Sequence, residues 1–270
     1  MKVAIFQGPD NSYDVEQNLQ QLAQQAELAA AQGAGLIMTS EMFLSGYNIG
    51  ADEIAARAQS VDGDAATRVA AIAKAQKIAI LYGYPERDGE RIYNAAQVFD
   101  SDGQRLAAYR KTHLFSDIDH DAFSPGENAS VTFMLDGWCI GLLICYDVEF
   151  PENMRRLALD GVDFVAVPTA LMRPYEFVPQ KMLPTRAFEN GVFVAYANRC
   201  RNENGLDYCG LSCIVGPDGV DLARAAEDEL LIFATLDREL LEQWRGINTY
   251  AQDRRPELYA AIGSKPGAEK

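Results

Sequence analysis

The sequence predicts a single α/β domain in which helices cover the faces of β-sheets. Along the 270 residues, short apolar runs alternate with stretches whose apolar residues recur every three to four positions. No low-complexity block, short repeat or Pro/Gly/Ser-rich linker divides the chain. Hydrophobic residues make up 48% of it, which is enough for a sizeable core.

The first predicted elements are a strand at 2–7 and a long helix. The helix is indicated by five apolar residues at spacings of four and three: Val15, Leu19, Leu22, Ala26 and Ala29. Asn11, Ser12 and Asp14 are candidate caps at its start, and Gly33 is a plausible stop.

A buried strand follows at 35–43 and carries an acidic residue near its end. The pattern at 64–77 predicts a second helix, with Asp64 as its cap. Two hairpin-type turns then separate three strands in quick succession. These three strands are expected at 78–84, 92–100 and 105–114.

The second half of the chain repeats this plan. Helices are expected from Pro151 to Gly161 and over 176–190. Strands are expected at 130–135, 138–145, 162–168 and 191–198, and in the last apolar runs before residue 237. Residues 1–245 therefore form one predicted domain, and 246–270 form a polar, irregular C-terminal tail.

Composition narrows the class of function. A net charge of −15 argues against binding to nucleic acid, which requires a basic face. No apolar stretch reaches the roughly 20 residues of a membrane span, and the N-terminus lacks the pattern of a signal peptide. We therefore expect a cytoplasmic protein. Two histidines and five cysteines without a C-x-x-C pair predict free thiols and no structural metal site.

Three reactive side chains each close a separate apolar run. They are Glu41, Lys111 and Cys145, and ligand sites in sheet-based α/β folds gather at strand ends. A cysteine nucleophile needs a base for its proton and a group that stabilises the oxyanion. Other interpretations remain open: Cys145 as a buried hydrophobe, or paired with His113 or His120.

The segments around these residues, "SEMFLSGY", "YRKTHLF" and "GLLICYDVEFPE", resemble the signature of the nitrilase, or carbon-nitrogen hydrolase, superfamily. The similarity extends through "PTALM", "RAFENGVFVAYANR" and "GLSCIVGPDG". The resemblance implies a four-layer α-β-β-α sandwich of the nitrilase type. It also implies that residues 1–245 form a carbon-nitrogen hydrolase domain.

The resemblance assigns a role to each reactive residue. Cys145 is similar to the family nucleophile, Glu41 to its general base and Lys111 to the group that stabilises the oxyanion, together with the backbone N–H of Tyr146. Many amidase members carry a second glutamate eight residues after the lysine. Here that position holds Asp119, which either fills the accessory role or is a loop acid.

Substrate-binding residues are predicted around this centre. They are Tyr47, Asp147, Glu149, Met172 and Glu176. A carboxylate would be needed for a substrate that carries a distal ammonium, and Glu176 is one candidate. The alternative for Glu176 is an acid that stabilises a helix start. Glu149 either binds substrate or pairs with Arg155 or Arg156.

The resemblance also suggests the reaction. Nitrilases usually carry Cys-Trp-Glu, whereas this chain has Cys145-Tyr146-Asp147, which favours an amide over a nitrile. The motifs are similar to those of bacterial 5-aminopentanamidase-like enzymes. They imply hydrolysis of a short aliphatic, amine-bearing carboxamide to acid and ammonia through a thioester, with no cofactor or metal. An N-carbamoyl-amine hydrolase or ω-amidase is the alternative, ahead of a nitrilase, an acyltransferase or an inactive scaffold. A homodimer or larger homo-oligomer is expected, with the tail 246–270 at a subunit interface.

Overall fold

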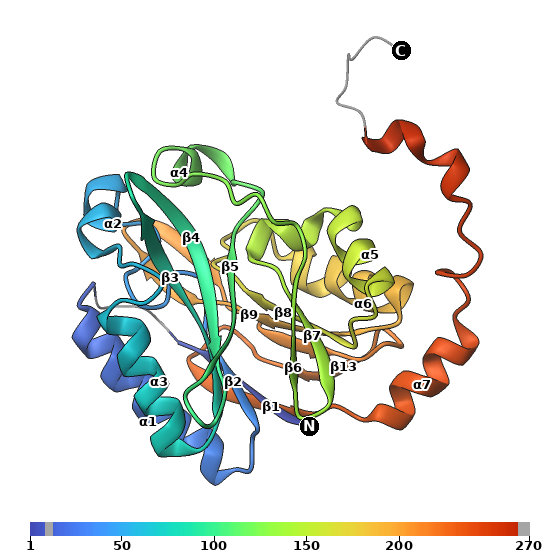
Figure 1. Cartoon of the computed structure of the whole chain (residues 1–270), viewed down its shortest axis with the longest axis horizontal. Helices are drawn as coiled ribbons and strands as arrows, with labels where there is room; N and C mark the ends of the chain where they lie inside the picture. Colours follow the sequence, from blue (N-terminus) through green and yellow to red (C-terminus); the bar gives the residue numbers. More distant parts are fainter. Residues whose placement is uncertain (9–12, 264–270) are drawn as a thin grey trace.

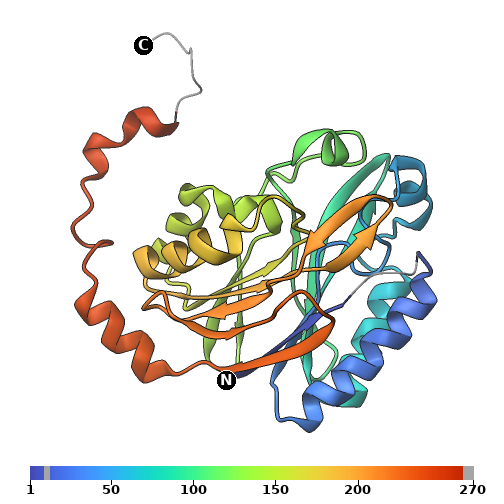
Figure 2. The same ribbon diagram turned by 180° about the vertical axis from the view of Figure 1, so that it is seen from behind.

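The computed structural model describes residues 1–8 and 13–263. Within these residues, two six-stranded sheets lie face to face and helices cover their outer faces, as Figures 1 and 2 show. The four layers confirm the predicted α-β-β-α sandwich. Of the candidate helix caps, Asn11 and Ser12 lie outside the described residues.

The first sheet has the strand order β14-β1-β2-β3-β4-β5. The bounds of these strands in chain order are β1 (Lys2–Gln7), β2 (Leu36–Met38), β3 (Ala79–Asp88), β4 (Arg91–Phe99), β5 (Arg105–Arg110) and β14 (Leu230–Thr235). The pairs β1–β2 and β2–β3 are parallel, and the other neighbouring pairs are antiparallel. Its outer face is covered by α1 (Val15–Ala31) and α3 (Asp64–Gln76).

The second sheet has the order β13-β12-β9-β8-β7-β6, with β7, β8 and β9 parallel. The bounds of its strands are β6 (Val131–Leu135), β7 (Trp138–Leu142), β8 (Phe164–Pro168), β9 (Phe193–Ala197), β12 (Cys213–Val215) and β13 (Asp221–Arg224). Its helices are α5 (Pro151–Leu159) and α6 (Leu183–Asn190), the latter preceded by a π-helical turn, Val178–Met182.

The inner strands β1, β2, β8 and β9 are buried on both faces. In β1, Val3 and Ile5 pack in the core between the sheets, whereas Ala4 and Phe6 pack toward α1 and α3. This follows from the two-residue period of a strand. Burial on both sides explains why the strands are continuous apolar runs in the sequence, without polar alternation.

The reactive residues lie just beyond strand ends. The strand expected at 35–43 ends at Met38, the one at 105–114 ends at Arg110, and the one at 138–145 ends at Leu142. These three predicted strands were too long because buried residues continue from each strand into the following loop. Glu41, Lys111 and Cys145 therefore sit on loops that the two sheets hold in place.

Gly83 explains how the Glu41 loop approaches the first sheet so closely. A Cβ atom at Gly83, on β3, would lie only 2.6 Å from the backbone N of Met42 and from the carbonyl O of Ser40. Met42 itself has a positive φ of 52°. The absence of a side chain on β3 lets the backbone turn across the strand and direct Glu41 inward.

Other boundaries refine the prediction. Asp14 caps α1 as expected, because its carboxylate accepts a hydrogen bond of 2.8 Å from the backbone N–H of Glu16. Asp64, predicted as a cap, is instead the first residue of α3, and Gly63 occupies the cap position. Its carboxylate still lies in the first turn, where the helix dipole favours an acid.

Several elements were not predicted. They are α2 (Ala51–Arg57), α4 (Ser116–His120), the hairpin of β10 (Cys200–Glu203) and β11 (Leu206–Cys209), and α7 (Arg238–Ile247). The helix α7 crosses the predicted domain boundary at 245. Beyond it the chain contains 3₁₀ turns at Pro256–Leu258 and Ala260–Gly263. Among the described residues, no helix is both long enough and apolar enough to span a membrane.

Candidate active site

Three charged side chains meet in a fully buried cluster. Lys111 Nζ donates to Glu41 Oε1 and to Asp119 Oδ2, and both distances are 2.7 Å. The three side chains have no exposed surface. Sequence spacing placed Glu41 and Lys111 at separate strand ends, and the fold brings them into direct contact.

The two carboxylate oxygens of Glu41 have different surroundings. Oε1 accepts from Lys111 and, at 2.6 Å, from Asn94 Nδ2 on β4. Oε2 is buried and has no hydrogen-bond partner within the described residues. Burial raises the pKa of Glu41 above its usual value, and Lys111 offsets only part of this rise. One oxygen is therefore held in place while the other is available to take up a proton.

Asp119 holds Lys111 from the opposite side. Besides Lys111, its carboxylate accepts from the hydroxyl of Tyr47 at 2.9 Å and from the backbone N–H of Phe115 at 2.8 Å. Burial by itself favours neutral lysine, but the charges of Glu41 and Asp119 outweigh it and hold the pKa of Lys111 well above its usual value. Lys111 is thus a fixed cation.

Cys145 opens a short 3₁₀ helix, Cys145–Glu149 (η1), directly after β7. Its φ of +47° is unusual for a residue with a side chain and marks a sharp, rigid turn. The side chain is 7% exposed. Burial and the charge of Glu41 raise the pKa of the thiol, while Lys111 lowers it by less. Lys111 thus favours the thiolate, but burial and Glu41 outweigh it, so the resting thiol carries its proton.

Asp147 connects the Cys145 turn to the Lys111 loop. Oδ2 accepts from the hydroxyl of Tyr109 at 2.8 Å and from the N–H of Ile144 at 3.2 Å. Oδ1 accepts from the N–H groups of Thr112 and His113 at 3.2 and 2.8 Å. Because this carboxylate is fully buried and engaged by the protein, the geometry favours a positioning role over substrate contact.

The thiol borders a small cavity with room for about one water molecule. The residues that line it are Tyr47, Phe115, Cys145, Glu149, Ala170, Leu171, Met172 and Tyr175. Three of the predicted substrate-binding residues, Tyr47, Glu149 and Met172, thus border the same space as the thiol.

Glu176 has other partners. Its carboxylate pairs with Arg173 at 2.5 Å, and Arg173 also contacts Asp207 at 3.2 Å and Glu227 at 2.7 Å. Glu176 is not among the residues that line the Cys145 cavity. Glu176 thus belongs to an ion-pair network centred on Arg173 and does not border the cavity of the thiol.

The histidines do not contact Cys145. His113 Nδ1 lies 2.8 Å from Asp147 Oδ1, and its ring stacks on Phe150 with 4.0 Å between centroids. His120 ends α4 and is exposed. Neither residue lines the cavity of the thiol. Within the described part of the chain, no group of three or more His, Cys, Asp or Glu residues could hold a metal ion.

Two residues near the catalytic cluster were missed in the sequence. Asn94 interrupts the apolar run of β4 and hydrogen-bonds Glu41, so a polar residue inside a buried strand was the available signal. Thr169 follows β8, and a hydrogen bond from its side chain lowers the pKa of Cys145. The signal for Thr169 was its place at the end of a buried strand.

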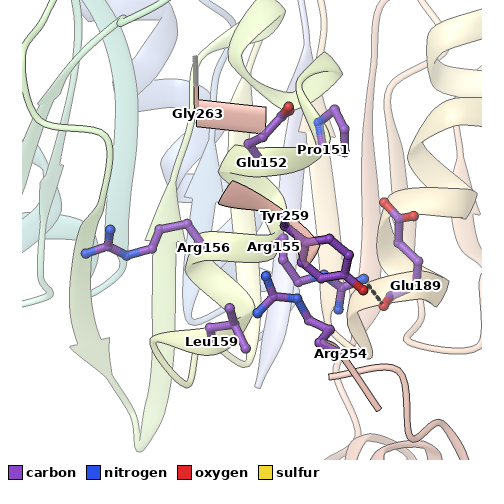
Figure 3. A pocket seen from close by; sticks show the side chains of 9 residues that line it. All are labelled: Pro151, Glu152, Arg155, Arg156, Leu159, Glu189, Arg254, Tyr259 and Gly263. Atoms are coloured by element: carbon purple, nitrogen blue, oxygen red, sulfur yellow. Dashed lines mark hydrogen bonds between the residues drawn. The ribbon is translucent and has the colours of Figure 1, made fainter. Parts of the chain in front are cut away.

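A second hollow lies against α5 and the C-terminal segment (Figure 3). Its lining residues are Pro151, Glu152, Arg155, Arg156, Leu159, Glu189, Arg254, Tyr259 and Gly263. Arg155 Nη2 donates to the carbonyl of Glu189 at 2.8 Å, and Arg156 pairs with Asp160 at 3.0 Å. Neither arginine pairs with Glu149 among the described residues, and none of the proposed catalytic residues lines this hollow.

Comparisons with known proteins agree with this geometry. A model of the carbon-nitrogen hydrolase family matches residues 2–246. A relative from Pseudomonas protegens, described as "Hydrolase in pqqF 5'region", is 55% identical over 267 residues, with 98% of this chain and 93% of the relative covered. A nitrilase from Pyrococcus abyssi is 34% identical over 264 residues, with coverages of 96% and 99%.

Solved structures are also similar. The crystal structure of an amidase from Nesterenkonia sp. has a TM-score of 0.84 and 35% identity, with 97% of this chain and 96% of that chain covered. A mutant of the amidase from Nesterenkonia sp. AN1 shows the result of Michael addition of acrylamide at its active-site cysteine.

Proposed function

This chain belongs to the carbon-nitrogen hydrolase family and is an amidase, and on that premise we propose that Cys145 hydrolyses a short aliphatic carboxamide through a thioester. The observation that carries the proposal is the buried Oε2 atom of Glu41, which has no hydrogen-bond partner within the described residues. A general base requires such an oxygen near the proton that it abstracts. The cysteine adduct of the similar amidase supports the choice of nucleophile.

Acylation begins from a protonated thiol. As Sγ of Cys145 attacks the amide carbon, Glu41 takes the thiol proton and the carbonyl electron pair moves onto the oxygen. Lys111 and the backbone N–H of Tyr146, in the first turn of η1, stabilise this oxyanion. When the C–N bond breaks, Glu41 returns the proton to the nitrogen, ammonia leaves, and the acyl group remains on sulfur.

Deacylation reverses these roles with water. Glu41 takes a proton from a water molecule whose oxygen attacks the thioester carbon, and Lys111 again stabilises the oxyanion. The C–S bond then breaks, the thiolate recovers a proton from Glu41, and the acid leaves. Asp119 acts in both steps by holding Lys111 in place.

The proposal is tested by ammonia release from a neutral aliphatic amide, an amino-alkyl amide, glutaramate, an N-carbamoyl amine and a nitrile. We expect turnover of amides, none by Cys145→Ala, and an acyl adduct on Cys145 by mass spectrometry. Hydroxylamine should divert part of the product to a hydroxamate. Turnover that survives in Cys145→Ala would refute the mechanism. Preferential turnover of glutaramate, the carbamoyl compound or the nitrile would select an ω-amidase, an N-carbamoyl-amine hydrolase or a nitrilase instead.

We also propose that copies of the chain associate through the C-terminal segment. Exposed apolar side chains gather on the outer helices and on this segment, and isolated proteins rarely leave such patches open. They are Leu159, Phe188, Ile247, Tyr250 and Leu258. A homodimer or larger assembly would cover them.

A further inference from the structure

Glu149 is a carboxylate without a partner beside the nucleophile. It lines the same cavity as Cys145, and it is the one carboxylate among the lining residues described above. No hydrogen bond or ion pair reaches its side-chain oxygens from the described residues, and only its backbone carbonyl accepts one, from Arg186. Buried or half-buried charges are normally paired, so this carboxylate requires an explanation.

The two nearby cations are both occupied elsewhere. Arg186 donates to the carbonyls of Val148 and Glu149 at 3.2 and 2.8 Å, and its guanidinium pairs with Glu189 at 2.9 Å. Lys111 is held between Glu41 and Asp119. Both attract Glu149 through space but neither contacts its carboxylate. The protein thus leaves the position of a direct cationic partner open.

Because the cavity has room for only about one water molecule, its walls must move apart to admit a substrate, and their chemistry suits a cation. Tyr47, Phe115 and Tyr175 supply aromatic rings, and Phe115 and Tyr175 meet edge to face with 5.8 Å between centroids. Aromatic faces attract organic cations, most strongly where water is excluded. The net charge of −15 adds a field that draws cations toward the protein.

We propose that Glu149 binds an ammonium group at the far end of the substrate, so that this enzyme prefers amides that carry a protonated amine. The inference rests on the proposed amidase function and assigns the specificity of the same site. Burial raises the pKa of Glu149 to about 7, because it disfavours the charged form more than Lys111 and Arg186 favour it. An incoming ammonium would relieve this penalty by pairing with the carboxylate.

The test compares amides of equal shape and different charge. Amino-alkyl amides of two to six methylenes are paired with neutral amides in which a methyl group replaces the ammonium. For wild type, kcat/KM should favour the cationic member at one chain length. In Glu149→Gln, we expect the ratio of cationic to neutral kcat/KM to fall by about ten-fold or more, mainly through KM.

A matched control removes the same charge elsewhere. Glu152→Gln changes an exposed acid in the first turn of α5, three residues along the chain, and should leave the ratio unchanged. Glu149→Arg should shift preference toward an amide that carries a distal carboxylate, such as glutaramate. Circular dichroism verifies that each variant is folded.

A second measurement needs no variant. A short alkylammonium ion should protect Cys145 of the wild-type enzyme from iodoacetamide, whereas the alcohol of equal length should not. An unchanged ratio in Glu149→Gln, or equal protection by ammonium and alcohol, would overturn the assignment of Glu149. Absence of ammonia release from every amide by wild type would instead refute the proposed function.

Discussion

Glu41 influences the protonation of the Cys145 thiol. The charge of Glu41 raises the pKa of the thiol, and Lys111 acts in the opposite direction. The sequence gives no sign of this electrostatic effect of Glu41, the proposed base, on Cys145, the proposed nucleophile. The effect also separates two properties that usually change together, thiol acidity and catalytic rate.

The variant Glu41→Gln should therefore lower the pKa of the Cys145 thiol while it abolishes turnover. Loss of the carboxylate charge leaves Lys111 as the dominant neighbour, which favours the thiolate. The pH profile of alkylation by iodoacetamide should move to lower pH. Ammonia release should fall by about 10²- to 10⁴-fold because the general base is gone. If the pH profile of alkylation is unchanged or moves to higher pH, the charge of Glu41 does not raise the pKa of the thiol.

The proposed role of Glu149 predicts a pH dependence of specificity. Its pKa is raised to about 7, so the carboxylate is mostly protonated at pH 6 and mostly ionised at pH 8. Lys111, whose charge acts on it, stays protonated over this range. The cationic-to-neutral ratio of kcat/KM should rise about ten-fold between pH 6 and pH 8. Titration of Glu41 affects both substrates and cancels in the ratio. The rise should be absent in Glu149→Gln.

At the scale of single residues, the sequence predicted the reactive residues that end apolar runs. It missed the side chains that form hydrogen bonds and ion pairs with the predicted residues. Glu41, Lys111 and Cys145 are visible because a reactive group after a buried strand is unusual. The surroundings of Glu176 were not visible, because Asp207 and Glu227, which share Arg173 with it, lie more than 30 residues along the chain. The role of Asn94 likewise depends on which strand lies beside β3.

At the scale of elements, β3 sets the position of Glu41, the proposed base. The Glu41 loop crosses β3 at Gly83, where the backbone of Ser40 and Met42 leaves no space for a Cβ atom. The precision of the site thus depends on a residue that carries no functional group.

Gly83→Ala should displace the Glu41 loop and reduce both stability and rate. Overpacking of a buried site costs about 1–3 kcal/mol in the free energy of unfolding. A displacement of the base by a fraction of an ångström or more should lower kcat by about 10- to 100-fold. Denaturant unfolding and ammonia release measure the two effects.

The control is Gly246→Ala in α7, where a Cβ atom would meet nothing within 4 Å. This change should leave kcat unaltered and stabilise the helix slightly. If Gly83→Ala had the same stability and the same rate of ammonia release as Gly246→Ala, the close approach of the Glu41 loop to β3 would not constrain the position of Glu41.

Length explains part of what was predictable, although α7, with ten residues, was missed while α5, with nine, was predicted. The helix α1 extends over 17 residues, enough for several turns of apolar periodicity, whereas α4 has five. Strand lengths were overestimated where buried loops are as apolar as strands, as after Met38 and Leu142. The sequence pattern indicates which residues are buried, and burial continues beyond the last hydrogen bond between neighbouring strands.

At the scale of the whole molecule, the C-terminal segment (residues 238–263) contacts the body through α7 and through Asn248 and Tyr250, which reach Phe188. Arg245 donates to the carbonyls of Gly191 and Val162 and pairs with Asp163 at 2.9 Å. Beyond α7 the segment extends past α5 and α6, as Figures 1 and 2 show. It carries Tyr250 and Leu258, two of the exposed apolar residues.

Removal of residues 248–270 should reduce the molar mass of the assembly in solution, because it deletes apolar surface that the proposed interface buries. Light scattering after size exclusion measures the mass, and a chain shortened only by residues 264–270 provides the control. Equal masses for the two shortened chains and the full chain would exclude this segment from the interface.

The division of the catalytic groups between two sheets also has a consequence during synthesis. Glu41 and Lys111 follow strands of the first sheet and Cys145 follows β7 of the second, while β1 must await β14, which is made more than 220 residues later. Glu41 and Lys111 therefore emerge from the ribosome before Cys145. Cys145 in turn emerges before β14 completes the first sheet. On the proposed mechanism, a nascent chain would turn over substrate only after the two sheets pack against each other. The onset of turnover thus marks the end of folding.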